Sequence, residues 1–169
     1  MKKYLLLLFL LLLLVPAKAQ IKLSDEAQIS ILTAAPSDEA VFTLYGHTAV
    51  RVKDSLHKID LVFNYGIFDF SKPNFIYRFT KGETDYKLAA YNFQHYIIEY
   101  QMRGSEVTEQ VLNFTPDEIN KIWNALYINV QPENCVYRYN FFFDNCATRP
   151  VAIVEEQVDG KIKYNDPPK

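Results

Sequence analysis

The chain has 169 residues, of which 49% are hydrophobic and 15% aromatic, and its formal net charge at pH 7 is −2. This length suits one domain with a sizeable core, and the apolar content excludes low-complexity disorder for most of the chain. Because acidic residues slightly outnumber basic ones, a basic nucleic-acid-binding protein is not expected, and nucleic acid is excluded as a partner.

The first nineteen residues have the pattern of a secretory signal peptide. Two lysines precede an unbroken apolar run over residues 5–15, and small residues follow at Ala17 and Ala19. Eleven residues are too few to span a bilayer, which needs about 20. We therefore predict a signal peptide over residues 1–19, a single exported domain over 20–160 and a frayed tail over 161–169. The domain then carries 15 basic and 20 acidic residues, a net charge near −5.

Strands and helices alternate along the rest of the chain without a regular βαβ rhythm. Alternating and β-rich segments predict strands at residues 28–33, 48–53, 59–65, 86–91, 106–114 and 136–142, with a hairpin over 48–65. Helical spacing and end signals predict helices at residues 37–44, 73–80, 93–103, 116–129 and 145–157. The clearest local signal is Thr115, followed by Pro116 and Glu118, a capping box before the fourth of these helices. The expected fold class is α+β, with helices packed on a mostly antiparallel sheet.

Two cysteines, Cys135 and Cys146, allow two interpretations. In an exported protein they could form a structural disulfide. Alternatively, Cys146 is a nucleophile, because it lies at a predicted strand-to-helix turn. There the partial positive charge of a helix N-terminus would lower its pKa, and free backbone N–H groups, with Asn145 assisting, could hold an oxyanion. Cys135 lies in a loop before a strand and has no such environment.

A nucleophilic cysteine needs a base, and His47 is the candidate. It follows Gly46 at the mouth of a predicted strand, where a side chain can be presented at the end of a sheet. The alternative is an ordinary buried or surface histidine. His57 and His95 are predicted to lie on the surface. No metal site is expected, since the three histidines lack ligand spacing.

The base also needs a residue that orients its ring. If the hairpin turn is centred near residue 56, His47 faces Tyr65, with Asn64 and Gly66 on either side. Asn64 or Tyr65 is therefore the preferred orienting residue. Asp69 and Asp144 remain alternatives, although Asp144 is better explained as the cap of the last helix.

Three segments in this order resemble the Lnb N-terminal periplasmic domain family: LYGHTA at 44–49, VFNYGIFDF at 62–70 and DNCATR at 144–149. The order of histidine before cysteine is also similar to circularly permuted papain-like (NlpC-type) folds, including the lecithin retinol acyltransferase group. The resemblance implies a bacterial cell-envelope protein of the periplasm. It implies lipoprotein N-acylation, in which an acyl chain passes from a lipid donor through an enzyme thioester to an amine. By position, His47 would be the base and Cys146 the nucleophile, and no cofactor is implied.

The expected partners are a lipid or lipoprotein acyl substrate, a membrane surface and a membrane-embedded domain. Longer members of the family continue into a membrane-embedded part, so this chain is either a stand-alone domain or a piece of a longer protein. Three alternatives to the acyltransferase remain: a peptidoglycan-directed thiol amidase or peptidase, a non-catalytic binding domain, and a truncated inactive product. The many aromatic residues suit either a ring-rich core or a groove for an apolar or sugar ligand.

Overall fold

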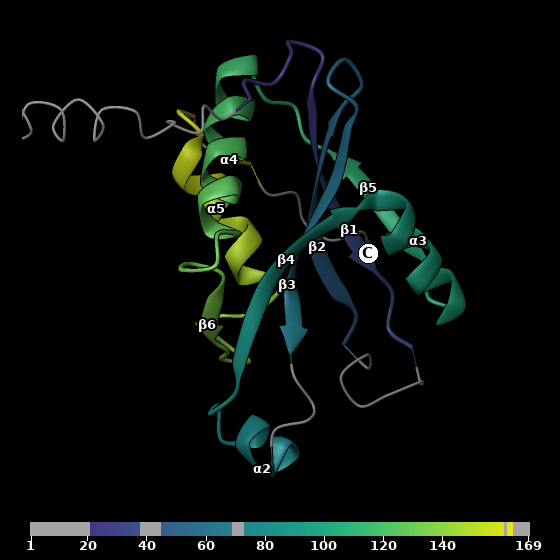
Figure 1. Ribbon diagram of the computed structural model, residues 1–169, viewed down its shortest axis with the longest axis vertical. Helices are drawn as coiled ribbons and strands as arrows, with labels where there is room; N and C mark the ends of the chain where they lie inside the picture. The colour runs from purple at the N-terminus through teal and green to yellow at the C-terminus, as the bar shows by residue number, and fades with distance from the viewer. Residues whose placement is uncertain (1–20, 38–44, 69–72, 161, 164–169) are drawn as a thin grey trace, which may run out of the picture.

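A six-stranded antiparallel sheet forms the centre of the computed structural model, which describes residues 21–37, 45–68, 73–160 and 162–163 (Figure 1). The strands are β1 (Gln28–Ala34), β2 (His47–Asp54), β3 (Ile59–Phe68), β4 (Asp85–Asn92), β5 (Val107–Val111) and β6 (Val136–Arg138). Their order across the sheet is β5-β1-β2-β3-β4-β6. The predicted α+β class with an antiparallel sheet is confirmed. The predicted signal peptide, the segment 38–44 of the predicted first helix, Asp69 and nearly all of the predicted tail lie outside the described residues.

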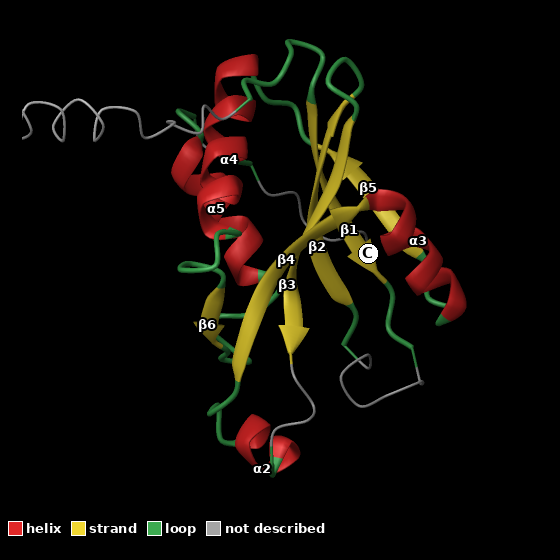
Figure 2. Ribbon diagram, viewed as in Figure 1, coloured by secondary structure: helices red, strands yellow, loops and turns green. Residues whose placement is uncertain are grey.

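Helices cover both faces of the sheet (Figure 2). Those described are α2 (Phe75–Thr80), α3 (Phe93–Met102), α4 (Pro116–Asn129) and α5 (Thr148–Gln157). Helices α4 and α5 lie together on one side, α3 lies on the other, and α2 sits beyond one end of the sheet. The predicted capping box is confirmed: Glu118 N–H donates to Thr115 Oγ1, and Thr115 N–H donates to Glu118 Oε2. None of these helices is long and apolar enough to cross a membrane.

Alternation along the strands divides the core into two layers. Val50, Val52, Phe63 and Tyr65 point into the larger cluster, which α4 and α5 complete. Their neighbours Ala49 and Val62 point to the opposite face, where Leu32, Tyr96 and Tyr100 form the smaller cluster under α3. Successive residues of one strand thus serve different layers, as the period of two requires.

The segment between β6 and α5 differs from the prediction. The strand expected over 136–142 ends at Arg138, and the helix expected from 145 begins at Thr148. The side chain of Asn140 accepts from the N–H groups of Phe142 and Phe143, and that of Asn145 accepts from Ala147 and Thr148. These local bonds offer the backbone an alternative to a ladder or a helix, so a turn replaces both ends.

The residues before β1 are fastened to the hairpin and to α4. Ser24 donates to Asp54 with both its backbone N–H and its hydroxyl, each at 2.8 Å. Trp123 Nε1 donates to the carbonyl of Ile21 at 2.9 Å. Burial would raise the pKa of Asp54, but the hydrogen bonds from Ser24 and His57 hold it well below its usual range. The start of the described chain is therefore part of the packed structure.

Candidate thiol active site

A tight turn places His47 at the beginning of β2. Gly46 has a φ of 71°, and a Cβ there would lie 2.6 Å from the carbonyl oxygen of Ala34. Glycine alone tolerates this backbone and this approach. The next residue, His47, pairs with Ala34 across β1 and β2, at the end of the strand where a side chain can lie beside the turn.

The imidazole of His47 contacts Asn64 of β3. His47 Nε2 lies 2.7 Å from Asn64 Oδ1, the same oxygen accepts from Gly66 N–H at 2.8 Å, and Asn64 Nδ2 donates to Tyr91 Oη at 2.7 Å. A backbone N–H can only donate, so the amide atom facing Gly66 must be the oxygen. His47 Nε2 must then carry the hydrogen, because it also faces that oxygen. In the neutral ring Nδ1 is therefore the unprotonated nitrogen.

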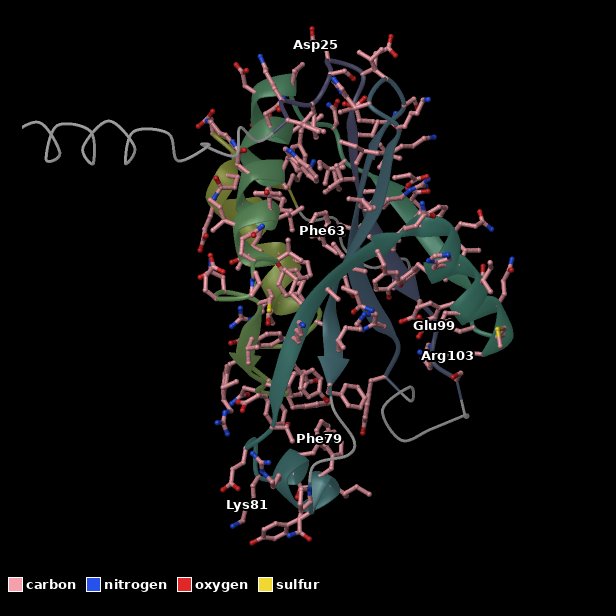
Figure 3. The ribbon with its side chains drawn as sticks, in the orientation of Figure 1. Asp25, Phe63, Phe79, Lys81, Glu99 and Arg103 are labelled. Carbon is pink, nitrogen blue, oxygen red and sulfur yellow. The ribbon has the colours of Figure 1, made fainter. Side chains whose placement is uncertain are left out.

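The ring itself is enclosed on the α3 side of the sheet. It stacks on Tyr100 with centroids 6.3 Å apart, and a Cβ on Gly66 would lie 2.5 Å from its Cε1 atom. Burial, opposed by the bond to Asn64 and assisted by the charge of Arg103, lowers the pKa of His47 to about 4. Figure 3 shows Glu99 on α3 and Arg103 just after its last residue, on this side of the sheet. At neutral pH the imidazole is therefore uncharged.

The thiol of Cys146 lies in the turn before α5. The backbone N–H groups of Thr48 and of Cys146 itself act to lower the pKa of the thiol. Burial nevertheless raises the pKa of the thiol, since desolvation outweighs these two donors. The expectation that a helix N-terminus lowers this pKa is wrong in direction. The N–H groups of Ala147 and Thr148, which begin the helix, already donate to Asn145 Oδ1.

The thiol and the imidazole approach the same end of β2 from different layers. Thr48, whose backbone N–H acts to lower the pKa of the thiol, directly follows His47. The β2–β3 ladder runs from Asp54–Ile59 to Val50–Phe63, so this end of β2 lies beyond the last of those pairs. The imidazole packs against Tyr100 of α3. The thiol precedes α5 and faces the larger cluster, where burial first and the Cys146 sulfur second raise the pKa values of Tyr137 and Tyr139.

The structure brings Asn64 to His47 but places Tyr65 elsewhere. Tyr65 points into the larger cluster, its hydroxyl accepts from Asn129 Nδ2 at 3.4 Å, and burial raises its pKa to about 12. The predicted hairpin register is wrong by one residue. Because Val50 pairs with Phe63, the register places His47 opposite Gly66 rather than Tyr65.

Comparison with known proteins agrees with the motifs around these residues. The sequence model of the Lnb N-terminal periplasmic domain matches residues 17–168. The chain belongs to the Lnb N-terminal periplasmic domain family. Membership confirms the predicted family and export to the periplasm, and it makes the chain an envelope-associated domain. No curated protein and no solved structure matches the sequence.

In this Lnb N-terminal periplasmic domain, Asp144 and Asn145 have structural partners. Asp144 forms an ion pair with Arg149, with Nη2 and Oδ2 2.7 Å apart. Asn145, not Asp144, supplies the oxygen that caps the turn into α5. The expectation that Asp144 caps the last helix is therefore wrong. Asp69 lies outside the described residues.

Both cysteines of the domain are free thiols, so the disulfide interpretation is not supported. Cys135 is buried, and its thiol donates to the carbonyl of Pro132 at 3.6 Å. His57 and His95 are exposed as predicted. Within the described ranges, no group of three or more His, Cys, Asp or Glu side chains gathers to hold a metal ion.

Sequence reasoning missed two contributors to this site, Thr48 and Tyr91. Thr48 acts through its backbone, which no side-chain pattern reveals. Tyr91 lies 27 residues after Asn64 and meets it only because β4 pairs with β3, where Val62 is opposite Tyr91. A correct β3–β4 register was the one signal that would have identified it.

Proposed function

We propose that this domain is a cysteine acyltransferase of the cell envelope that takes acyl chains from lipid esters. The observation that carries the proposal is that the N–H of Thr48, the residue that follows His47, lies near enough to the Cys146 thiol to lower its pKa. The imidazole there has its Nε2 hydrogen directed to Asn64 and its Nδ1 available as a base. A cysteine, a histidine and an asparagine in these roles correspond to the papain-like arrangement. A circularly permuted papain-like fold is the architecture that we propose for the domain.

The resting state is a neutral pair rather than an ion pair, because burial disfavours both charged forms. In the proposed reaction, His47 Nδ1 takes the thiol proton as the sulfur bonds to the ester carbonyl carbon. The tetrahedral intermediate then expels the alcohol, which takes its proton from the imidazolium, and an acyl thioester remains on Cys146. An amine attacks the thioester, the amide forms and the thiol is regenerated. If water attacks instead, the product is a fatty acid.

Negative charge on the carbonyl oxygen needs nearby donors. The N–H groups of Cys146 and Thr48 both act to lower the pKa of the thiol, so they are the donors that we assign to the oxyanion. The first N–H groups of α5 are occupied by Asn145, whose part is to hold the turn that carries Cys146. Asn64 keeps its oxygen on Nε2–H and favours the imidazolium while it exists.

The surface beside Cys146 supports an apolar substrate. Phe142 and Phe143, four and three residues before the thiol, are 75% and 82% exposed. Tyr45, 74% exposed, makes an edge-to-face contact with Phe141 at 5.3 Å. Exposed rings in a group favour contact with acyl chains or a membrane surface. A lipid or lipoprotein substrate, presented by a membrane or by a membrane-embedded partner, is the class that we propose.

The test is a mass measurement on the purified protein after incubation with phospholipid vesicles and a diacylated lipopeptide. The wild-type protein should gain a hydroxylamine-sensitive acyl group on Cys146 and pass it to the lipopeptide amine. Cys146→Ala and His47→Ala should gain none while remaining folded. Cys135→Ala is the matched control, since it removes the other thiol and should keep the reaction.

Acylation that persists in Cys146→Ala would overturn the mechanism. Cleavage of peptidoglycan peptides without acyl transfer would instead indicate the amidase or peptidase alternative. A folded protein that binds vesicles but performs neither reaction would be a non-catalytic binding domain or an inactive piece of a longer enzyme. The chemical state of Cys146 in protein isolated from its native envelope gives a second, independent measurement.

A further inference from the structure

Helix α2, beyond one end of the sheet, carries more apolar side chains than its inner contacts use (Figure 1). Phe75 and Phe79, one turn apart, stack on each other, and Phe79 also stacks on the ring of Tyr139. Ile76 and Tyr77 are instead 74% and 58% exposed. A helix that is apolar all round is normally buried, yet α2 has no buried residue. The exposed side of α2 therefore lacks the apolar surroundings that its sequence suits.

The turn that precedes Cys146 lies beside α2 and exposes further rings. Tyr139, whose ring stacks on Phe79, leads into this turn over residues 140–144. Backbone hydrogen bonds of 2.8 and 3.0 Å between its first and last residues close the turn, and the side chain of Asn140 accepts from two of its N–H groups. The three phenylalanines at 141–143 are 43%, 75% and 82% exposed. A fixed backbone therefore presents these rings outward.

Positive charge borders these rings, although the chain as a whole is acidic. Residues 73–87 and 136–149, which form this end, hold five basic and three acidic residues, a net charge of +2. Residues 20–169 together have a net charge of −5. Lys81 Nζ lies 4.6 Å from the centroid of the Tyr77 ring, and Figure 3 shows Lys81 at the α2 end of the molecule. This end thus differs from the rest of the domain in the sign of its charge.

We propose that α2 and the turn over residues 140–144 form a membrane-docking end that binds the surface of an anionic phospholipid bilayer. Rings bordered by lysine and arginine are typical of surfaces at a membrane interface. Lysine is depleted where proteins bind each other, so the composition favours lipid over a protein partner. Because α2 and the turn both make contact, docking also fixes the orientation of the domain on the bilayer.

Docking by this end presents the thiol to the lipid. Phe143 lies three residues before Cys146, so the Cα atoms of the two are at most ~11 Å apart. Interfacial apolar groups enter the boundary between headgroups and acyl chains by ~5–10 Å, and the ester groups of phospholipids lie at that boundary. That this arrangement serves acyl transfer rests on the proposed function, whereas the docking itself does not.

The test is flotation of the purified protein with vesicles of phosphatidylethanolamine and phosphatidylglycerol, compared with vesicles of phosphatidylcholine. The wild type should bind the anionic vesicles more tightly, and salt should weaken this binding. Ile76→Ser should reduce the partition coefficient by roughly tenfold or more, because one apolar side chain no longer enters the bilayer. Lys81→Gln should reduce it by about fivefold on anionic vesicles only. Ile128→Ser, at a 57% exposed position of α4, is the matched control and should bind as the wild type does.

Tryptophan fluorescence reports insertion directly. The chain has one tryptophan, Trp123, which is buried, so an added tryptophan supplies the signal that responds to lipid. In Tyr77→Trp, anionic vesicles should shift the emission to shorter wavelength, and brominated lipids should quench it. Ile128→Trp places the added ring on α4 and should keep its emission.

No vesicle binding by the wild type would overturn the inference, as would equal binding by Ile76→Ser or an unchanged emission of Tyr77→Trp. A wild type that binds no vesicles but forms dimers, which Ile76→Ser dissociates, would make this end a contact between copies of the chain.

Thioester formation distinguishes the two proposals. If the wild type and Cys146→Ala bind vesicles equally and the wild type forms no thioester, the proposed function fails and the docking stands. If the wild type takes acyl groups from detergent-dispersed phospholipid but binds no vesicles, the docking fails and the proposed function stands.

Discussion

The two faces of the sheet contrast in what they bury. The face under α4 and α5 holds the larger cluster, in which Phe63 and Trp123 meet edge to face with centroids 6.0 Å apart. The face under α3 buries fewer apolar side chains and adds charged and polar ones, including Arg51 and Asn64. The same strands supply both faces. The layer under α4 and α5 therefore supplies most of the apolar packing, while the layer under α3 positions buried polar side chains.

The two faces must therefore respond to substitution in different ways. Where packing dominates, removing a side chain leaves a cavity whose cost grows with its size. Where polar groups are buried, each needs a partner. Arg51 shows this well, because it bonds Asp60 and Glu109 and lies 3.4 Å over the Phe93 ring. Removing one partner on that face leaves another group unsatisfied.

The largest effect on stability is expected on the α4 face. Leu126 is fully buried, so Leu126→Ala should lower the free energy of unfolding by about 2–5 kcal/mol. Ile128 on the same helix is 57% exposed, and Ile128→Ala should change it by about 0.5 kcal/mol or less. Urea denaturation measures both. Equal small losses would mean that this layer is not the main source of stability.

As the pH falls, the free energy of unfolding should first decrease because of His47, on the α3 face. The folded-state pKa of His47 is about 4, below its ordinary value of 6.5. Between these values the unfolded chain binds a proton that the folded chain does not, so stability should fall as the pH falls from 6.5 to 4. The slope from this group reaches up to ~1.4 kcal/mol per pH unit and vanishes above that window.

Denaturation midpoints at several pH values measure this slope. His47→Gln should remove it, whereas His95→Gln, at an exposed position of α3, should retain it. Asp54, whose pKa is held well below its usual range, contributes at lower pH, because its stabilisation is lost only as the pH falls below its ordinary value of 3.8. A slope that persists in His47→Gln would place its origin in another group.

A methyl group at residue 66 should disturb the α3 face directly. Its Cβ would lie 2.5 Å from His47 Cε1 and 3.1 Å from Asn64 Oδ1. The ring must move, which should cost about 1–3 kcal/mol in overpacking and should also slow alkylation of Cys146. Gly160→Ala is the control, since a Cβ there meets nothing within 4 Å. An unaltered NMR spectrum of the His47 side chain in Gly66→Ala would contradict this geometry.

The smallest effect on activity is expected at Tyr65, whereas its neighbour Asn64 should show a large one. Asn64→Ala should reduce thioester formation by roughly tenfold or more, because it releases the imidazole. Tyr65→Phe should keep the rate within about twofold, since the bond it loses is a long one of 3.4 Å to Asn129 on the other face. Rate measurements that rank the two variants in the opposite order would refute the assignment of faces.

Local signals predicted much of the fold, and long-range pairing explains most of what they missed. The Thr115–Glu118 capping box lies within four residues and was predicted in full. The hairpin was also predicted, but its turn occupies residues 55–58, with Lys58 at a φ of 56°. Its centre is half a residue later than expected. A shift of one residue in register exchanges the two faces, so Tyr65 replaced Gly66 as the expected neighbour of His47.

Burial explains the remaining differences at the site. Sequence predicts where a thiol lies relative to a helix, but not how much protein covers it, and coverage raised the pKa of Cys146. The side chains of Asn140 and Asn145 moved the ends of β6 and α5 by bonding the nearby backbone. Asparagine has this capacity anywhere, and only the folded turn shows where it is used.

The fastening of the first described residues has a consequence for the timing of folding. Trp123 bonds Ile21 across 102 residues and Asn120 bonds Leu23 across 97, while β1 lies between β2 and the late strand β5. A chain that crosses a membrane N-terminus first must hold these early segments open until α4 and β5 have emerged. Closing such long loops is slow, and an unpaired strand attracts other chains meanwhile. The domain should therefore complete its fold late in export, and a periplasmic holding chaperone should raise its yield.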